Sequence, residues 1–377
     1  MIVKNKVLHI STDNKFIEGA KNTFNQIFEY NTFLILSYFF QKLKFVKSGN
    51  NILIWRYHRF LLSLNSNFFN EYDIIILHDM NYFNSRLVIK RPELNYIYIS
   101  WGYEIYNNKY ILEKFPGIDI FNYNPIKAKS FKKYCINLIK YGLIISEHKN
   151  YEIIFKAINK IENIVISKTE WNLLKALNIL NSQCNLMPSF SYNPFVQIAT
   201  LNKKAKDINI IVGNCSVEEI GHIKIFEILS KFSIDRIISP LSYGDFKYRK
   251  LVITTGEVLF QEKFQPIIEF EDLSSYREYF KNSSFYFDSS KRQRAWGNIV
   301  LCLEFGLKIF LNPLNPIYSL IKSLGGNVYS IEELSENSLK KLTVIQMNEN
   351  QQIIRKYYSK EAIKSNWINY FNSKNLK

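Results

Sequence analysis

Short apolar runs alternate with longer amphipathic stretches along most of this 377-residue chain. The runs are rich in Ile, Val and Leu and lack a regular alternation of apolar and polar positions. Continuous runs of this kind are typical of parallel strands that are covered by helices on both faces. In the first half of the chain they predict strands over residues 6–11, 51–55, 72–79, 95–102 and 163–168, with a helix over 15–27.

The same pattern begins again after residue 207. The stretch before it, residues 188–207, contains two prolines and a basic cluster and is typical of a linker. The order of the elements that follow matches a second α/β unit. Strands are predicted over 208–215, 284–289 and 307–313, and a strand together with the loop after it over 234–244. Helices are predicted over 218–232, 276–283, 296–306 and 350–371.

The chain is too long for an ordinary single core, and its two similar halves predict two domains. We expect two doubly wound, Rossmann-like α/β domains that face a cleft. The first covers residues 1–200 and the second covers residues 201–345. Residues 346–377 are expected to form a helical region that packs back on the first domain.

The chain carries a net charge of +16, and most of the excess lies in residues 1–205. Such a surface favours nucleic acid, anionic lipid or a phosphorylated ligand. The positive charge is dispersed and no nucleic-acid recognition motif is present, so we expect no nucleic-acid partner. The four cysteines are far apart and form no CxxC pair, which indicates a reducing, cytoplasmic compartment and no metal site.

Two apolar stretches bear on membrane association. The run at residues 30–40 has about half of the ~20 residues that a spanning helix needs. The N-terminus lacks the apolar core of a signal peptide. Residues 130–146 have the spacing of a basic amphipathic helix, which would lie on an anionic membrane or simply cover the sheet. We therefore expect peripheral association with an anionic membrane surface at most.

Polar residues follow the predicted strands of the first half, where ligands of open α/β sheets bind. His78 and Glu104 are candidate bases, because a side chain at this edge could take a proton from a substrate hydroxyl. A structural role for either residue is an equally simple interpretation. The other candidates near these strand ends, all expected on the acceptor side, are His9, Asp13, Lys15, Trp101 and Gly102.

In the second half, two turns follow predicted strands. Gly213 and Asn214 form a turn in which backbone N–H groups could approach a phosphate. Tyr243 and Gly244 follow the next strand, and the tyrosine could stack on a nucleobase. A plain tight turn and a tyrosine packed under its loop are the alternative interpretations.

Three cations, Lys291, Arg292 and Arg294, stand directly before the helix predicted over 296–306. A helix N-terminus is already electropositive, so this arrangement is unfavourable unless an anion is shared. Arginine suits bidentate phosphate contact, and we expect Arg292 to make it, with the other two cations as solvated flanks. A solvated basic loop is the alternative. Glu304, near the helix end, is a candidate for a ribose hydroxyl, with a simple exposed side chain as the alternative.

Seven segments together, in order and spacing, match a known pattern: VLHISTDNKFI (7–17), ISWGYEIY (99–106), IIVGNCSVEEIGHIKIFEIL (210–229), PLSYGD (240–245), EFEDLSSY (269–276), KRQRAWGNIVLCLEFGLKIFLN (291–312) and NPIY (315–318). They resemble the bacterial TDP-4-acetamido-4,6-dideoxygalactose transferases of N-acetylfucosaminyl transferase type, which act in enterobacterial common antigen synthesis. Trp296 and Gly221 depart from the family pattern, and the counterpart of Glu304 can be Gln.

The resemblance implies a GT-B glycosyltransferase without a metal or other cofactor. It implies a TDP-sugar donor and an undecaprenyl-diphosphate-linked saccharide acceptor at the inner face of the cytoplasmic membrane. A sugar-nucleotide epimerase or hydrolase with the same layout is the main alternative, and a donor or acceptor other than these two is a further one. The donor-side residues are expected to be Gly213, Asn214, His222, Tyr243, Gly244, Arg292, Gln293, Asn298 and Glu304.

Overall fold

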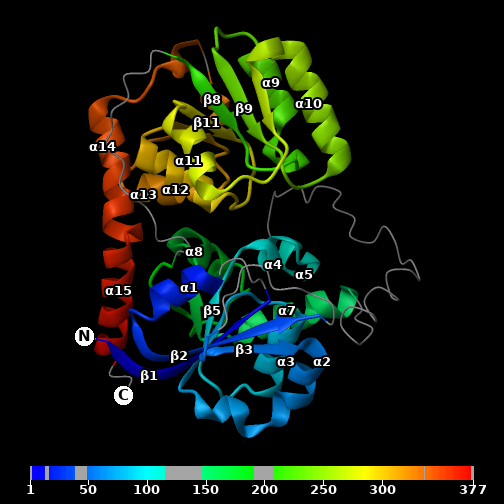
Figure 1. Ribbon diagram of the computed structural model, residues 1–377, viewed down its shortest axis with the longest axis vertical. Helices are drawn as coiled ribbons and strands as arrows, with labels where there is room; N and C mark the ends of the chain where they lie inside the picture. The colour runs from blue at the N-terminus through cyan, green and yellow to red at the C-terminus, as the bar shows by residue number, and fades with distance from the viewer. Residues whose placement is uncertain are drawn as a thin grey trace. The chain divides into compact units, whose positions relative to one another are not determined.

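The computed structural model describes residues 2–12, 17–38, 49–114, 147–190, 207–334 and 336–374. The chain forms two compact units. The first unit is Met1–Phe195 together with Lys360–Lys377, and the second unit is Val196–Ser359. Each contains one parallel sheet with helices on both faces (Figure 1). The predicted fold class, two doubly wound α/β domains, is therefore confirmed.

The first unit has a seven-stranded sheet in the order β3-β2-β1-β4-β5-β6-β7. All its strand pairs are parallel, and His9 of β1 lies opposite Ile76 of β4. The strand order reverses direction between β1 and β4. The strands are β1 (Val3–Ser11), β2 (Phe28–Ser37), β3 (Ile52–Arg56), β4 (Ile74–Leu77), β5 (Tyr96–Ile99), β6 (Asn163–Val165) and β7 (Asn185–Leu186).

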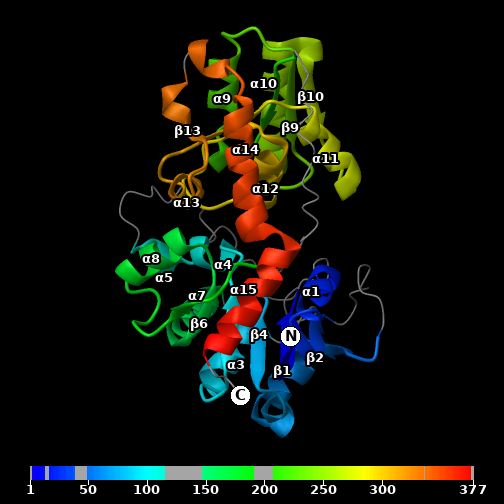
Figure 2. The same ribbon diagram turned by 90° about the vertical axis from the view of Figure 1, so that its left-hand side faces the viewer.

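Helices cover both faces of this sheet and bury two separate apolar clusters. The C-terminal helix α15, red in Figure 2, belongs to this unit although it ends the chain. Its Trp367 is fully buried, lies 5.2 Å from the Phe24 ring and donates to Ser189 O at 3.2 Å. The helices are α1 (Ile17–Phe24), α2 (Tyr57–Leu62), α3 (Tyr82–Lys90), α4 (Tyr103–Tyr106), α5 (Lys109–Leu112), α7 (Glu147–Lys160), α8 (Lys168–Ala176) and α15 (Lys360–Ser373), with 3-10 turns η1 (Ser63–Asn65) and η2 (Asn67–Glu71).

The second unit has a six-stranded parallel sheet in the order β10-β9-β8-β11-β12-β13. This order equals that of the first six strands of the first unit, and it reverses between β8 and β11. Its strands are β8 (Asn209–Val212), β9 (Arg236–Pro240), β10 (Phe264–Ile267), β11 (Phe285–Asp288), β12 (Lys308–Leu311) and β13 (Val328–Ser330).

The helices of the second unit connect these strands. A short 3-10 turn, η3 (Glu218–Ile220), precedes α9, because Gly221 adopts a left-handed conformation that divides the single helix predicted over 218–232. The helices are α9 (His222–Leu229), α10 (Phe246–Phe260), α11 (Leu273–Lys281), α12 (Trp296–Phe305), α13 (Pro316–Ser323) and α14 (Val344–Ile353), with 3-10 turns η4 (Gln261–Lys263), η5 (Ile331–Glu333) and η6 (Glu336–Leu339) and a π-helical turn, η7 (Ile354–Tyr358).

Several helices that follow a strand begin with a side-chain cap. Asn81, Asp245, Asp272 and Asn315 each accept hydrogen bonds from backbone N–H groups in the first turn of α3, α10, α11 and α13. α12, like α2, α4 and α9, has no side-chain cap bond, and its N-cap is Ala295 in a left-handed conformation. The electropositive start of α12 is therefore not satisfied by its own cap residue.

Candidate functional site

Two histidines meet where the strand order of the first unit reverses. His9 Nδ1 lies 3.0 Å from His78 Nε2, and His9 Nε2 lies 3.0 Å from Asn31 Oδ1. The Asn31 amide nitrogen donates to the carbonyls of Phe24 and Phe28, so Oδ1 accepts the proton of His9 Nε2. His9 Nδ1 must then accept the proton of His78 Nε2, which leaves the lone pair of neutral His78 on Nδ1.

Both imidazoles are held neutral. Burial lowers the pKa of His9 to about 3, against a weaker opposing effect of the Asn31 hydrogen bond. Burial, with the neighbouring His9, lowers the pKa of His78 well below its usual range. The pair is therefore uncharged at neutral pH, and a proton added to it would be poorly stabilised.

Glu104 is a buried carboxylic group on the short helix α4, directly after β5. Its Oε1 accepts hydrogen bonds from Tyr98 OH at 2.5 Å and from Trp101 N at 3.0 Å. Its Oε2 is buried and has no hydrogen-bond partner among the described residues. Burial raises the pKa of Glu104 to about 7, although the Tyr98 hydrogen bond opposes the rise. A carboxyl group of this kind can take up or release a proton near neutral pH.

The loop between β5 and α4 links Glu104 to the histidines. Gly102 has φ 84°, a conformation that favours glycine, and is the N-cap of α4. The indole N–H of Trp101 donates to the backbone carbonyl of His78. His9, His78, Trp101, Gly102 and Glu104 thus lie at one sheet edge, whereas Asp13, Lys15 and the segment 130–146 lie outside the described residues.

Close approaches that admit only glycine shape the corresponding edge of the second unit. Gly213 has φ 71°, and a Cβ there would lie 2.7 Å from Ile220 Cγ2 and 2.8 Å from His222 Nε2. Gly244 has φ 117°, and a Cβ would lie 2.5 Å from the Ser216 carbonyl oxygen. The Gly244 approach joins the loop after β9 to the loop after β8, whereas the Gly213 contacts lie within the connection from β8 to α9.

Asn214 and Tyr243 form a polar bridge between the same two loops. Asn214 Nδ2 donates to Tyr243 OH at 2.7 Å, while Asn214 Oδ1 is buried without a partner among the described residues. The Tyr243 residue is 54% exposed, so its ring keeps an open face. The turn therefore has an exposed aromatic face and a buried amide oxygen without a partner among the described residues.

His222 is the first residue of α9 and is fully buried. Neither of its ring nitrogens has a hydrogen-bond partner among the described residues. Burial lowers the pKa of His222 to about 3, and the charge of Arg294 acts in the same direction. A buried imidazole without partners is destabilising by itself, which marks this position as a possible ligand contact.

The cationic loop before α12, residues 291–294, differs from the prediction in the position of the Arg294 side chain. Arg292 Nε donates to both carboxylate oxygens of Glu219 at 2.9 and 3.0 Å, and Arg294 Nη1 donates to Glu219 Oε2 at 2.6 Å. Arg294 Nη2 also contacts Cys215 Sγ at 3.0 Å. Arg294 is thus no solvated flank, because its side chain lies deeper in the unit than that of Arg292.

Asn315 fixes the position of this loop. Its Nδ2 donates to the carbonyls of Ser290 and Arg292, both at 2.9 Å, while its Oδ1 accepts from Ile317 N at 3.0 Å. One side chain therefore caps α13 and holds the loop before α12. Gln293, also expected on the donor side, is partly buried in this loop.

Glu304 is neither exposed nor open to a ligand in this arrangement. Its carboxylate is fully buried and accepts from Arg277 Nη1 at 3.0 Å and Nη2 at 2.5 Å. A ribose contact would require this bidentate pair to rearrange, because Arg277 engages both carboxylate oxygens. Asn298 likewise has a protein partner, with its Nδ2 donating to Tyr276 OH at 3.0 Å.

The sequence interpretation missed Glu219, Tyr98 and Asn315 as parts of these sites. Glu219 and Asn315 lie within segments that resemble the glycosyltransferase family, CSVEEIG and NPIY. The resemblance was a usable signal for both residues. No local pattern indicates that Tyr98 bonds to Glu104, because alternate strand residues point to opposite faces without specifying a partner.

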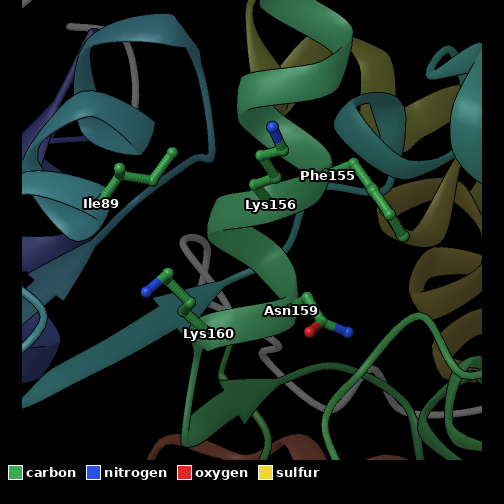
Figure 3. Close-up of a pocket in the computed structure, with 5 residues that line it drawn as sticks. All are labelled: Ile89, Phe155, Lys156, Asn159 and Lys160. Carbon is green, nitrogen blue, oxygen red and sulfur yellow. The ribbon is translucent and has the colours of Figure 1, made fainter.

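A cavity of about 290 Å³ lies elsewhere in the first unit, between α3 and α7 (Figure 3). It is lined by Ile89, Phe155, Lys156, Asn159 and Lys160. The end of α7 leads into the start of β6, so this cavity is at the opposite sheet edge from the histidines and Glu104. Its polar lining consists of surface side chains.

Within the described ranges, no group of three or more His, Cys, Asp or Glu side chains is arranged to hold a metal ion. None of the helices in the described ranges is both long and apolar enough to cross a bilayer.

No protein-family model and no curated protein sequence matches the chain. Solved structures match over its whole length. Sucrose-phosphate synthase from Thermosynechococcus elongatus has a TM-score of 0.67 at 8% identity and covers 99% of each chain. Anabaena HepE in complex with UDP-glucose has a TM-score of 0.61 at 11% identity, over 98% of this chain and 100% of that one.

A UDP-N-acetylglucosamine 2-epimerase described as putative, from Listeria monocytogenes, has a TM-score of 0.53 at 10% identity, over 100% of this chain and 97% of that one. At such low identity these likenesses establish the fold alone. The chain has the GT-B fold, as the resemblance implied.

We expect the neutral state of His222 to make stability depend on pH. Its pKa is about 3 in the folded chain and has the ordinary value of 6.5 when unfolded, so stability is greatest above pH 6.5 and falls as the pH drops towards 3. His222→Leu removes this pH-dependent contribution to stability. Relative to wild type, the variant's free energy of unfolding should rise by up to about 1.4 kcal/mol per pH unit below about pH 6. Urea unfolding of both proteins between about pH 7.5 and 4.5 measures this, and parallel curves would contradict it.

Proposed function

We propose that the chain is a glycosyltransferase that moves a 4-acetamido-4,6-dideoxyhexose, or a related deoxyamino sugar, from a TDP-sugar to an undecaprenyl-diphosphate-linked saccharide. The observation that carries the proposal is the polar cluster of the second unit. There, the Gly213–Asn214 turn, the unpartnered His222 ring and two arginines gather at the point where the strand order reverses. The identity of donor and acceptor rests on the family resemblance.

On the donor side, the second unit would bind the diphosphate. Backbone N–H groups at the start of α12 and the guanidinium of Arg292 stabilise negative charge that grows on the leaving group. The glycine at 213 lets the side chains of Ile220 and His222 approach the backbone closely, which fixes the turn at the carboxyl end of β8. The open ring face of Tyr243 offers a stacking surface for the nucleobase.

On the acceptor side, Glu104 of the first unit would act as general base if the reaction inverts the anomeric centre. The acceptor oxygen forms a bond to the anomeric carbon, and the bond from that carbon to the phosphate oxygen breaks. The electron pair leaves with TDP, and the acceptor proton moves to Oε2, which has no protein partner among the described residues. His78, neutral and with its lone pair on Nδ1, is the second candidate base. In a retaining reaction neither residue needs this role.

The remaining parts of the proposal are the compartment and the partner surface. The excess of positive charge in residues 1–205 would favour an anionic membrane, where a lipid-linked acceptor resides. We place the protein at the inner face of the cytoplasmic membrane on this basis. UDP or UDP-glucose is bound in the HepE structures of the same fold, which supports a nucleotide-sugar donor.

Turnover with and without acceptor tests the proposed reaction. Purified protein is incubated with TDP-sugars and UDP-sugars, in the presence and absence of a polyprenyl-diphosphate-linked saccharide. We expect nucleotide release only when the acceptor is present, and fastest with a TDP-deoxyamino sugar. Conversion without any acceptor would instead identify an epimerase or hydrolase, a possibility that the Listeria structure of the same fold keeps open.

Arg292→Ala should weaken TDP binding while leaving the fold intact. The loss of a charge-assisted phosphate contact is expected to raise Kd about 10- to 100-fold. Lys291→Ala is the matched control, because it removes one positive charge from the adjacent position of the same loop. Calorimetric titration measures both variants. Equal affinities of the two variants would remove Arg292 from the donor site.

Glu104→Gln should abolish transfer and spare donor binding. A lost general base is expected to lower the transfer rate at least about 100-fold. The control is Glu170→Gln, since Glu170 is also buried, has a raised pKa and accepts from Tyr106 OH at 2.7 Å.

The wild-type rate should also fall below about pH 7. Glu104, with its pKa near 7, is then protonated and can no longer accept a proton. Initial rates across the pH range measure this loss. Near-normal transfer by Glu104→Gln, or an equal loss in Glu170→Gln, would rule out the base role.

A further inference from the structure

Glu219 lies between two arginines that come from a different loop of the second unit. It belongs to η3, between β8 and α9, whereas Arg292 and Arg294 lie between β11 and α12. The carboxylate accepts from Arg292 Nε at 2.9 and 3.0 Å and from Arg294 Nη1 at 2.6 Å. The side chains of Glu219, Arg292 and Arg294 are 25%, 18% and 12% exposed, respectively. One partly buried carboxylate is thus shared by two guanidinium groups.

This carboxylate is ionised and balances only one of the two positive charges. Burial would raise the pKa of Glu219, but the hydrogen bonds and charges of the two arginines outweigh it and hold the pKa below its usual range. Arginine binds phosphate oxygens in the same forked geometry as carboxylate oxygens. Glu219 therefore uses hydrogen-bonding capacity that a bound diphosphate would also use.

The two arginines differ in burial. Arg294 is the more buried of the two and also contacts Cys215 Sγ at 3.0 Å. The backbone of Arg292 is fixed separately, because Asn315 Nδ2 donates to its carbonyl at 2.9 Å. The Arg292 side chain can therefore change partner without moving its loop, while Arg294 keeps Glu219 in place.

We propose that Glu219 is an internal counter-ion of the donor site, which holds both arginines in the ligand-free protein and is displaced from Arg292 by the donor diphosphate. The inference rests on the proposed function, because it takes the ligand to be a nucleoside diphosphate. Glu219 then has two opposite effects. It stabilises the free protein, and it weakens donor binding by competing for Arg292.

Glu219→Gln tests both effects, since glutamine keeps the size and one acceptor oxygen but removes the charge. Without ligand, the variant should unfold at a lower temperature than wild type. Its affinity for TDP and for inorganic pyrophosphate should rise roughly two- to five-fold, the range expected for losing a partly exposed ion pair. Thermal unfolding and isothermal titration calorimetry measure the two quantities.

Glu218→Gln is the matched control. Glu218 is the preceding residue and is exposed. Its substitution removes the same charge, so any change in TDP affinity of Glu218→Gln measures the general electrostatic effect alone. In an Arg292→Ala background, the gain in affinity from Glu219→Gln should shrink, because the competed guanidinium is absent.

The outcomes separate this inference from the proposed function. If Glu219 only orients the arginines, Glu219→Gln lowers stability and affinity together, and the inference is wrong. The inference is also wrong if Glu219→Gln and Glu218→Gln bind TDP with equal affinity. This conclusion requires that wild type binds TDP and that Arg292→Ala weakens that binding. If wild type and Glu219→Gln bind neither TDP nor pyrophosphate, the proposed donor site itself is wrong, and the counter-ion role fails with it.

Discussion

The polar site of the second unit depends on a steric contact between two loops. Ser289, after β11, donates through its backbone N and its Oγ to the carbonyl of Ile220, at 3.1 and 2.7 Å. A Cβ on Gly221 would collide with Ser289 Oγ, so only glycine permits this approach. Because the loops are joined here, Glu219 comes within reach of the arginines before α12. The electrostatic arrangement thus depends on a residue that carries no charge.

Much of the fold follows from the apolar pattern, and the gaps have physical reasons. The apolar runs now seen in β1, β4, β5, β8 and β11 are continuous and largely buried, which is why they could be identified without any alternation of apolar and polar positions. β2 was missed, since Phe28–Ser37 begins with the exposed pair Glu29–Tyr30 and merges into a longer apolar stretch. α10 was missed because Phe246–Phe260 mixes β-branched residues with an exposed apolar face, which weakens a helical pattern.

Site residues could be predicted from the sequence only where their position relative to a strand was sufficient. The positions of His9, His78 and Glu104 near strand ends brought them to one edge of the sheet, because parallel strands end together. Long-range partners were not predictable: Arg292 and Glu219 are 73 residues apart, and Arg277 and Glu304 are 27 apart. For this reason the sequence indicated an external anion for the cations before α12 but gave no sign that Glu219 pairs with them. It likewise indicated a ribose contact for Glu304 but gave no sign of its bond to Arg277.

The two units treat charge in different ways, and this difference bears on their roles. In the first unit, burial keeps both imidazoles neutral and raises the pKa of Glu104 to about 7, so the charge of this carboxyl group changes near neutral pH. In the second unit, permanent guanidinium charges are present and partly balanced by Glu219. Purely structural polar groups are normally satisfied within the protein. Under the proposed function, the bound donor and acceptor would supply partners for Glu104 Oε2 and the His222 ring, which have none among the described residues.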